Sequence, residues 1–111
     1  MPSYRMHLPI GDLHPGATPA DVMEQAALAL GSLHMIEKRD VEAPLVDGRR
    51  VGRVVLRYVV DPLEGRREDD TARHAVHMVI DHLERTTATI SPPRAVLLTR
   101  GGGRFRPISW R

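Results

Sequence analysis

Hydrophobic and polar side chains alternate along residues 3–10 of this 111-residue chain. A period of two over this length predicts a β-strand with one buried face. The polar face of the strand carries Arg5 and His7. The buried face consists of Tyr4, Met6, Leu8 and Ile10.

A helix is predicted to begin at Thr18-Pro19, after a loop rich in glycine and proline. Threonine is a favoured N-cap, proline suits the first helical position, and Asp21 places a negative charge in the first turn. An apolar face follows with helical spacing until Gly31-Ser32 weakens the pattern. Its members are Val22, Met23, Ala26, Leu30 and Leu33.

Residues 34–46 and 50–61 are predicted to form two strands joined at Asp47-Gly48, a dipeptide typical of hairpin turns. In the second strand Arg53 and Arg57 lie among valines on one face. The other face is apolar and consists of Val54, Leu56, Tyr58 and Val60.

A second helix is predicted from about Glu68 to Arg85, because apolar residues recur there with helical spacing. A last strand covers 95–99 and is followed by three glycines at 101–103. A short tail then carries Phe105, Ile108 and Trp110. These three side chains are the apolar residues by which the tail can pack.

The order of these elements predicts one α+β domain over residues 1–111, with the topology β-α-β-β-α-β and a short C-terminal strand. Right-handed crossovers give a four-stranded sheet with both helices on one face. The other face of the sheet is unusual, because it is polar rather than apolar. It carries Arg5, His7, Arg53 and Arg57.

Composition narrows the class of protein. Sixteen basic and fourteen acidic residues leave a formal charge of +2, which argues against a nucleic-acid or membrane partner held by bulk electrostatics. The absence of cysteine excludes disulfides, thiolate nucleophiles and cysteine-based metal sites. No apolar run is long enough to span a bilayer, so we expect a soluble, cytoplasmic protein.

The polar face of the second predicted helix carries Asp70, His74, His77 and Asp81 at spacings that share one surface. Two histidines with carboxylates can bind a divalent metal. The simpler interpretation is a solvated helix face, since the apolar stripe lies opposite, and we expect no metal site.

The strand at residues 50–58 faintly resembles the RNA-recognition strand of proteins that share this order of elements. Such a surface needs exposed aromatic rings for base stacking. Here Tyr58 is the only aromatic residue and falls on the apolar face, so no nucleic-acid partner is expected. Gly101-Gly102-Gly103 can cradle an anion, although a glycine run is more often a flexible turn.

The dipeptide Met1-Pro2 carries the remaining candidate chemistry. Removal of the methionine exposes a secondary amine, and apolar surroundings or nearby cations favour its uncharged form. Such an amine can act as a general base or nucleophile. A neighbouring arginine would hold an anionic substrate and stabilise charge on an enolate oxygen.

Three segments resemble the tautomerase superfamily, whose members begin Met-Pro and use the proline in catalysis. The start Met1-Pro2-Ser3-Tyr4 is similar to the family's opening strand. Asp47-Gly48, a strand, Glu64-Gly65-Arg66 and a helix together resemble 5-carboxymethyl-2-hydroxymuconate isomerases and cis-3-chloroacrylic acid dehalogenases. Residues 90–96, ISPPRAV, resemble the last helix-to-strand connection of the macrophage migration inhibitory factors.

The resemblance implies a homotrimer whose sheets pack around a central axis, with the polar face paired to acidic residues such as Glu37 and Asp40 across interfaces. The tail would then add to a neighbour's sheet. Pro2 matches the catalytic proline, and Arg66 an arginine that binds the substrate carboxylate. Leu63 stands where the dehalogenases have a further arginine, which puts dehalogenation in doubt.

Four further residues are candidates for substrate binding. Arg39 matches a substrate-binding arginine of the muconate-type enzymes, with Lys38 as the alternative register and an interface salt bridge as the simpler role. Tyr4 and Trp110 are candidates for the pocket wall, Trp110 from a neighbouring subunit, and core packing is the alternative for Tyr4.

The hypothesis from the sequence is a cofactor-independent isomerase of keto–enol tautomerase type, acting on a small unsaturated or 2-keto carboxylate with Pro2 as general base. The first alternative is a non-catalytic trimer of this superfamily that retains Met1 and binds a partner or serves a structural role. The second is a ferredoxin-like RNA-binding module, for which RNA affinity would depend strongly on salt.

Overall fold

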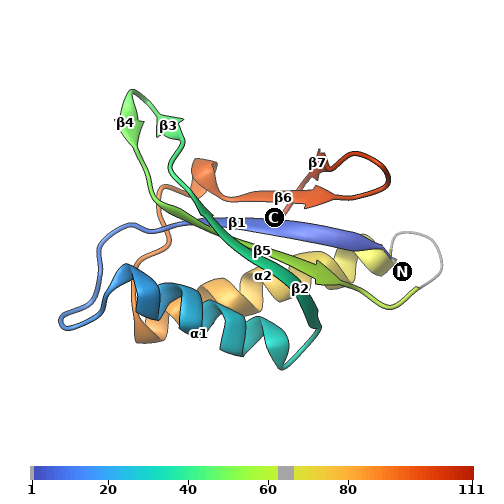
Figure 1. Cartoon of the computed structure of the whole chain (residues 1–111), viewed down its shortest axis with the longest axis horizontal. Helices are drawn as coiled ribbons and strands as arrows, with labels where there is room; N and C mark the ends of the chain where they lie inside the picture. The colour runs from blue at the N-terminus through green and yellow to red at the C-terminus, as the bar shows by residue number, and fades with distance from the viewer. Residues whose placement is uncertain (1, 63–66) are drawn as a thin grey trace.

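The computed structural model describes residues 2–62 and 67–111, which form an α+β fold with two helices and an antiparallel five-stranded sheet. A separate two-stranded hairpin and a short 3-10 turn complete the described residues (Figure 1). In chain order the elements are β1 (Ser3–Pro9), α1 (Pro19–Gly31), β2 (Met35–Glu42), β3 (Leu45–Val46), β4 (Arg49–Arg50), β5 (Arg53–Val59), α2 (Arg67–Thr86), η1 (Pro93–Ala95), β6 (Leu97–Arg100) and β7 (Arg106–Ile108).

The strand order of the sheet is β2-β5-β1-β6-β7. Strand β5 therefore lies between β1 and β2, and β1 lies between β5 and β6. Two interleaved β-α-β units of this kind constitute the split, ferredoxin-like arrangement. Both helices cover one face of the sheet and leave the other open (Figure 1).

The predicted four-stranded sheet is wrong in its count, because β7 extends the same sheet. Three residues of the tail pair with β6 in the register Leu98↔Ile108, Thr99↔Pro107 and Arg100↔Arg106. The glycines at 101–103 permit this reversal, and Gly103 has a φ of +95° that favours glycine. The tail strand thus pairs within its own chain.

The predicted strand 34–46 is also divided. β2 ends at Glu42, and Leu45–Val46 pairs instead with Arg49–Arg50. Pro44 separates the two segments and has no N–H for a sheet hydrogen bond. The turn predicted at Asp47-Gly48 is confirmed, with φ values of 51° and 78°.

The predicted start of the first helix is confirmed in detail. Thr18 Oγ1 accepts a hydrogen bond from Asp21 N at 3.2 Å, and the Asp21 carboxylate accepts one from Thr18 N at 2.9 Å. This reciprocal capping box satisfies two backbone donors at the helix end. Neither helix in the described ranges is long and apolar enough to cross a membrane.

The core lies between the helices and the covered face of the sheet. Tyr4, Met6 and Leu8 from β1 are fully buried there. They meet apolar residues of the other elements, among which the largest buried side chains are Leu30, Leu56, Tyr58, Leu83 and Leu98. Since the side chains of a strand alternate between faces, Arg5 and His7 necessarily point to the open face.

Candidate anion-binding site

Cationic side chains form a row across the open face of the sheet. In the strand register Lys38 lies opposite Arg57, and Arg57 lies opposite Arg5. Directly opposed residues of antiparallel strands have Cβ atoms about 4.5–5.5 Å apart, and like charges at that spacing repel. The row therefore concentrates positive charge where three strands meet.

Carboxylates neutralise only part of this row. Glu37 Oε1 accepts hydrogen bonds from Arg57 Nε at 3.1 Å and from Ser3 Oγ at 2.7 Å. Lys38 Nζ lies 3.9 Å from Asp40 Oδ2, with both side chains exposed. Arg5 has no carboxylate partner among the described residues, so it is the cation of the row most available to a ligand.

The guanidinium of Arg5 is held over an aromatic ring instead. Its Cζ lies 3.8 Å from the centroid of Phe105, and Arg57 Cζ lies 5.1 Å from the same centroid. Cations at these distances are attracted to the negative face of the ring. Phe105 thus holds two like-charged groups close together without cancelling their charge.

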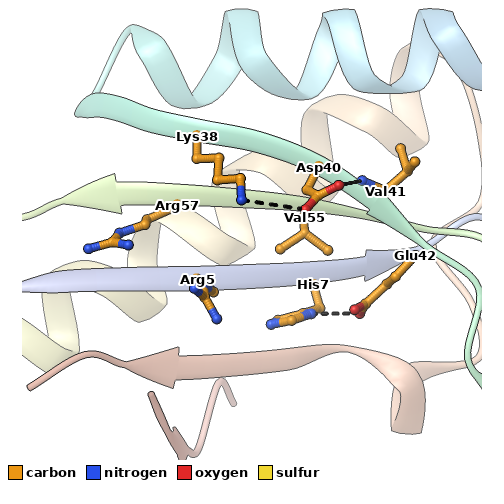
Figure 2. A pocket seen from close by; sticks show the side chains of 8 residues that line it. All are labelled: Arg5, His7, Lys38, Asp40, Val41, Glu42, Val55 and Arg57. Atoms are coloured by element: carbon orange, nitrogen blue, oxygen red, sulfur yellow. Dashed lines mark hydrogen bonds and ion pairs between the residues drawn. The ribbon is translucent and has the colours of Figure 1, made fainter. Parts of the chain in front are cut away.

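Two hollows adjoin this row. One, of about 190 Å³, lies over the strands, and Figure 2 shows its lining residues Lys38, Arg57 and Arg5 on three neighbouring strands. A second, of about 500 Å³, lies at the end of the sheet. Its wall consists of Pro2, Ser3, Arg5, Arg57, Gly101, Gly102, Gly103 and Phe105.

Pro2 is fixed at the edge of the second hollow by the sheet. Its carbonyl accepts a hydrogen bond from Val60 N at 3.1 Å, directly before β1 begins. This contact extends the pairing of β1 with β5 by one residue. Pro2 is consequently held in the same hollow as Arg5 and Arg57.

The structure brings two of the residues selected from the sequence, Pro2 and Lys38, to this surface. Arg39 lies opposite Leu56 in the register and lines a different hollow beside α1. Arg66, together with Glu64-Gly65 and Leu63, lies outside the described residues.

The two aromatic candidates lie on the helix side of the sheet. Tyr4 is fully buried, and its hydroxyl donates to Asp69 Oδ1 at 2.6 Å. Trp110 packs on α2 of its own chain, with its ring centroid 5.7 Å from that of His77. Neither ring lines a hollow on the open face.

Sequence reasoning identified Arg5 and Arg57 as polar positions of the sheet but not as ligand-binding residues, and it treated Phe105 as tail packing. The sequence feature that points to them is one arginine on the polar face of each of two predicted strands. Only the register reveals that the two are directly opposed.

The acidic residues expected to pair across subunit interfaces pair within the chain. Glu37 contacts Arg57, and Asp40 contacts Lys38. On the polar face of α2, Asp70 pairs with Arg73 at 2.6 Å and Asp81 with Arg85 at 2.9 Å. No cluster of three or more metal-ligating side chains occurs in residues 2–62 and 67–111.

Comparisons with known proteins add no relationship. No family model matches the chain, and no curated protein or solved structure matches it either.

Proposed function

We propose that this chain is an isomerase of tautomerase type that moves a proton in a small unsaturated or 2-keto carboxylate. The observation that supports it is the position of Pro2 in the hollow that Arg5 and Arg57 also line. A base and two carboxylate-binding groups at one site are what this chemistry needs.

In the proposed reaction, removal of Met1 makes Pro2 nitrogen a secondary amine. The two guanidinium groups favour its uncharged form, because a second positive charge nearby is costly. Arg57 and Arg5 bind the substrate carboxylate and the adjacent carbonyl oxygen.

The proton transfer then has two steps. Pro2 nitrogen takes a proton from the carbon next to the carbonyl, and the electrons of the broken C–H bond move onto the oxygen to give an enolate. The guanidinium groups stabilise that oxygen. The proton returns from the ammonium to another carbon, so the reaction needs no cofactor.

This proposal rests on the site and not on the fold, since one fold supports many functions. The ferredoxin-like strand order does not distinguish an isomerase from a binding module. The resemblance to the tautomerase superfamily consists of three sequence segments that are each weak alone, and it rests on their order and spacing. A carboxylate-binding role for Arg66 stays a prediction from that resemblance.

The homotrimer is likewise proposed from the resemblance. The physical reason to expect it is the open face of the sheet, where Arg5, His7 and Arg57 lie without a covering layer. Sedimentation equilibrium distinguishes one chain of 12.4 kDa from three, at about 37 kDa. A monomer at micromolar concentration would contradict the trimer and leave the chemistry at Pro2 untouched.

The role of Pro2 is tested by Pro2→Ala, measured as enolisation of phenylpyruvate or ketonisation of 2-hydroxymuconate in the ultraviolet. We expect kcat/KM to fall by about 10²-fold or more, the contribution typical of a positioned general base. Pro15→Ala, in an exposed loop, is the control and should retain full turnover. Near-normal turnover by Pro2→Ala would refute the role.

The first alternative, a trimer that retains Met1 and only binds, is separated by intact mass. Removal of Met1 lowers the mass by one methionine residue and leaves Pro2 with a free amine. If protein from the native host retains Met1, Pro2 nitrogen is an amide without basicity and the isomerase proposal is refuted.

A further inference from the structure

A third hollow lies across the glycine turn from the site of Pro2. It has a volume of about 350 Å³ and is lined by Arg100, Gly101, Gly102, Arg104, Arg106 and Ile108. Gly101 and Gly102 also belong to the wall of the hollow with Pro2. The two hollows therefore meet at this turn from opposite faces of the sheet, because Arg106 lies beside Arg100, whose side chain reaches α2 on the helix side.

The third hollow presents uncompensated positive charge. Arg100 is engaged by Glu68 at 2.8 Å and Asp69 at 2.7 Å. Arg104 and Arg106 are exposed and form no ion pair within the described part of the chain. Residues 94–111 contain five arginines and neither aspartate nor glutamate. This surface is therefore more strongly positive than the formal charge of +2 for the whole chain indicates.

The glycine turn leaves the way open between the hollows. A Cβ added at Gly102 or Gly103 would meet no atom within 4 Å, so the backbone here forms a low, uncovered ridge. A ligand that passes from one hollow to the other would bend around this turn. We define the basic track as the surface that runs from the open face, around this turn at the end of the sheet, to the third hollow. Its residues are Lys38, Arg57, Arg5, Phe105, Arg104 and Arg106.

We propose that the basic track binds a single-stranded nucleic acid, a function beyond the proposed isomerase that requires the open face to be uncovered and therefore excludes a trimer packed through that face. Arginines on both sides of the ridge suit successive phosphates of an extended strand. The guanidinium of Arg5, with its Cζ 3.8 Å from the centroid of Phe105, offers a planar group on which an unpaired base can stack. Bases in a duplex are already stacked and cannot use this plane.

The test is fluorescence anisotropy with a labelled 12-nucleotide RNA, the DNA of the same sequence, and its duplex, over a range of salt concentrations. Three or four phosphate contacts predict a slope of log K against log salt of about −2 to −3 for a single strand. We expect the single strands to bind at least fivefold more tightly than the duplex. Equal binding of the duplex would overturn the proposal.

The double variant Arg104→Gln/Arg106→Gln should weaken binding about tenfold at low salt and reduce the slope by about 1.4, the share of two contacts. Its matched control is Arg49→Gln/Arg50→Gln, which removes the same charge from exposed β4, at the far end of the molecule in Figure 1. An equal loss in both double variants would mean binding by overall charge and would contradict the basic track.

Stacking and catalysis are tested separately. Phe105→Leu keeps an apolar side chain but removes the ring, and it should weaken RNA binding about fivefold or more. Arg104→Gln/Arg106→Gln should leave isomerase turnover unchanged, whereas Pro2→Ala should leave RNA affinity unchanged. RNA binding without turnover refutes only the isomerase, and turnover without RNA binding refutes only the track.

Discussion

The ring of Phe105 occupies space that a side chain at Gly101 would need. A Cβ at Gly101 would lie 3.0 Å from Phe105 Cζ and 3.1 Å from its Cε1, and 3.3 Å from the carbonyl oxygen of Ser3. Gly101 N also donates to that carbonyl at 2.8 Å. The absence of a side chain at Gly101 therefore lets Phe105 reach Arg5 on the open face.

Gly101→Ala should displace Phe105 and separate it from Arg5. We expect a destabilisation of about 1–3 kcal/mol, the usual cost of forcing atoms into occupied space, measured as the free energy of unfolding in urea. Gly102→Ala is the control, because its added Cβ meets nothing within 4 Å. Equal stability of the two variants would contradict the close packing at Gly101.

The sequence predicted the positions of the helices, strands and turns better than the pairing of the strands. Alternation along β1 and β5, the cap at Thr18 and the turn at Asp47-Gly48 are local signals, and the structure contains all of these features. The end of β2 near Pro44 and the pairing of β7 with β6 depend on competition between segments, which no local pattern reports.

The candidate site shows the same limit. Pro2 is a candidate from the start Met1-Pro2 and the family resemblance, and Lys38 is the alternative to Arg39 in that resemblance. Both lie on the proposed surface. Arg5 and Arg57 become a pair only through the register of β1 with β5. Arg39, one residue after Lys38, points to the helix side, because a shift of one residue exchanges the faces of a strand.

Tyr4→Phe should cost more stability than the same change at Tyr58. The Tyr4 hydroxyl donates to the Asp69 carboxylate at 2.6 Å and accepts from Arg100 at 3.0 Å, whereas Tyr58 donates to the neutral carbonyl of Ala72 at 3.0 Å. Hydrogen bonds to charged groups contribute about 1.5–3 kcal/mol against about 1 kcal/mol for neutral ones.

Urea unfolding of the two variants at neutral pH makes the comparison. Both tyrosines are fully buried, so the two substitutions change burial equally. The variants therefore differ in the hydrogen-bond partners that the lost hydroxyl leaves behind. A larger loss of stability for Tyr58→Phe than for Tyr4→Phe would contradict the prediction that the charged partners of Tyr4 strengthen its hydrogen bonds.

Glu42 stabilises the other end of the open face, where its Oε1 lies 2.7 Å from His7 Nδ1 and 2.5 Å from an Arg53 guanidinium nitrogen. Burial raises the pKa of the Glu42 carboxyl, but hydrogen bonds and charge from His7 and Arg53 outweigh it, so the pKa lies below its ordinary value of 4.5. A carboxyl with a lowered pKa in the folded state stabilises the protein above its unfolded pKa. That contribution is lost as the pH falls through the folded pKa.

Glu42→Gln should therefore lower the free energy of unfolding by about 1 kcal/mol at pH 7, a modest value because the carboxylate is partly exposed. The difference should shrink as the pH falls below 4.5 and vanish once the wild-type carboxyl is protonated in the folded state, since a neutral carboxylic acid and an amide are nearly isosteric. Asp40→Asn is the control, because Asp40 is 59% exposed and 3.9 Å from Lys38, so its pair contributes little at either pH. A Glu42→Gln penalty that stays constant from pH 7 to pH 3 would mean that shape, and not the charge shared by His7 and Arg53, accounts for the effect of Glu42.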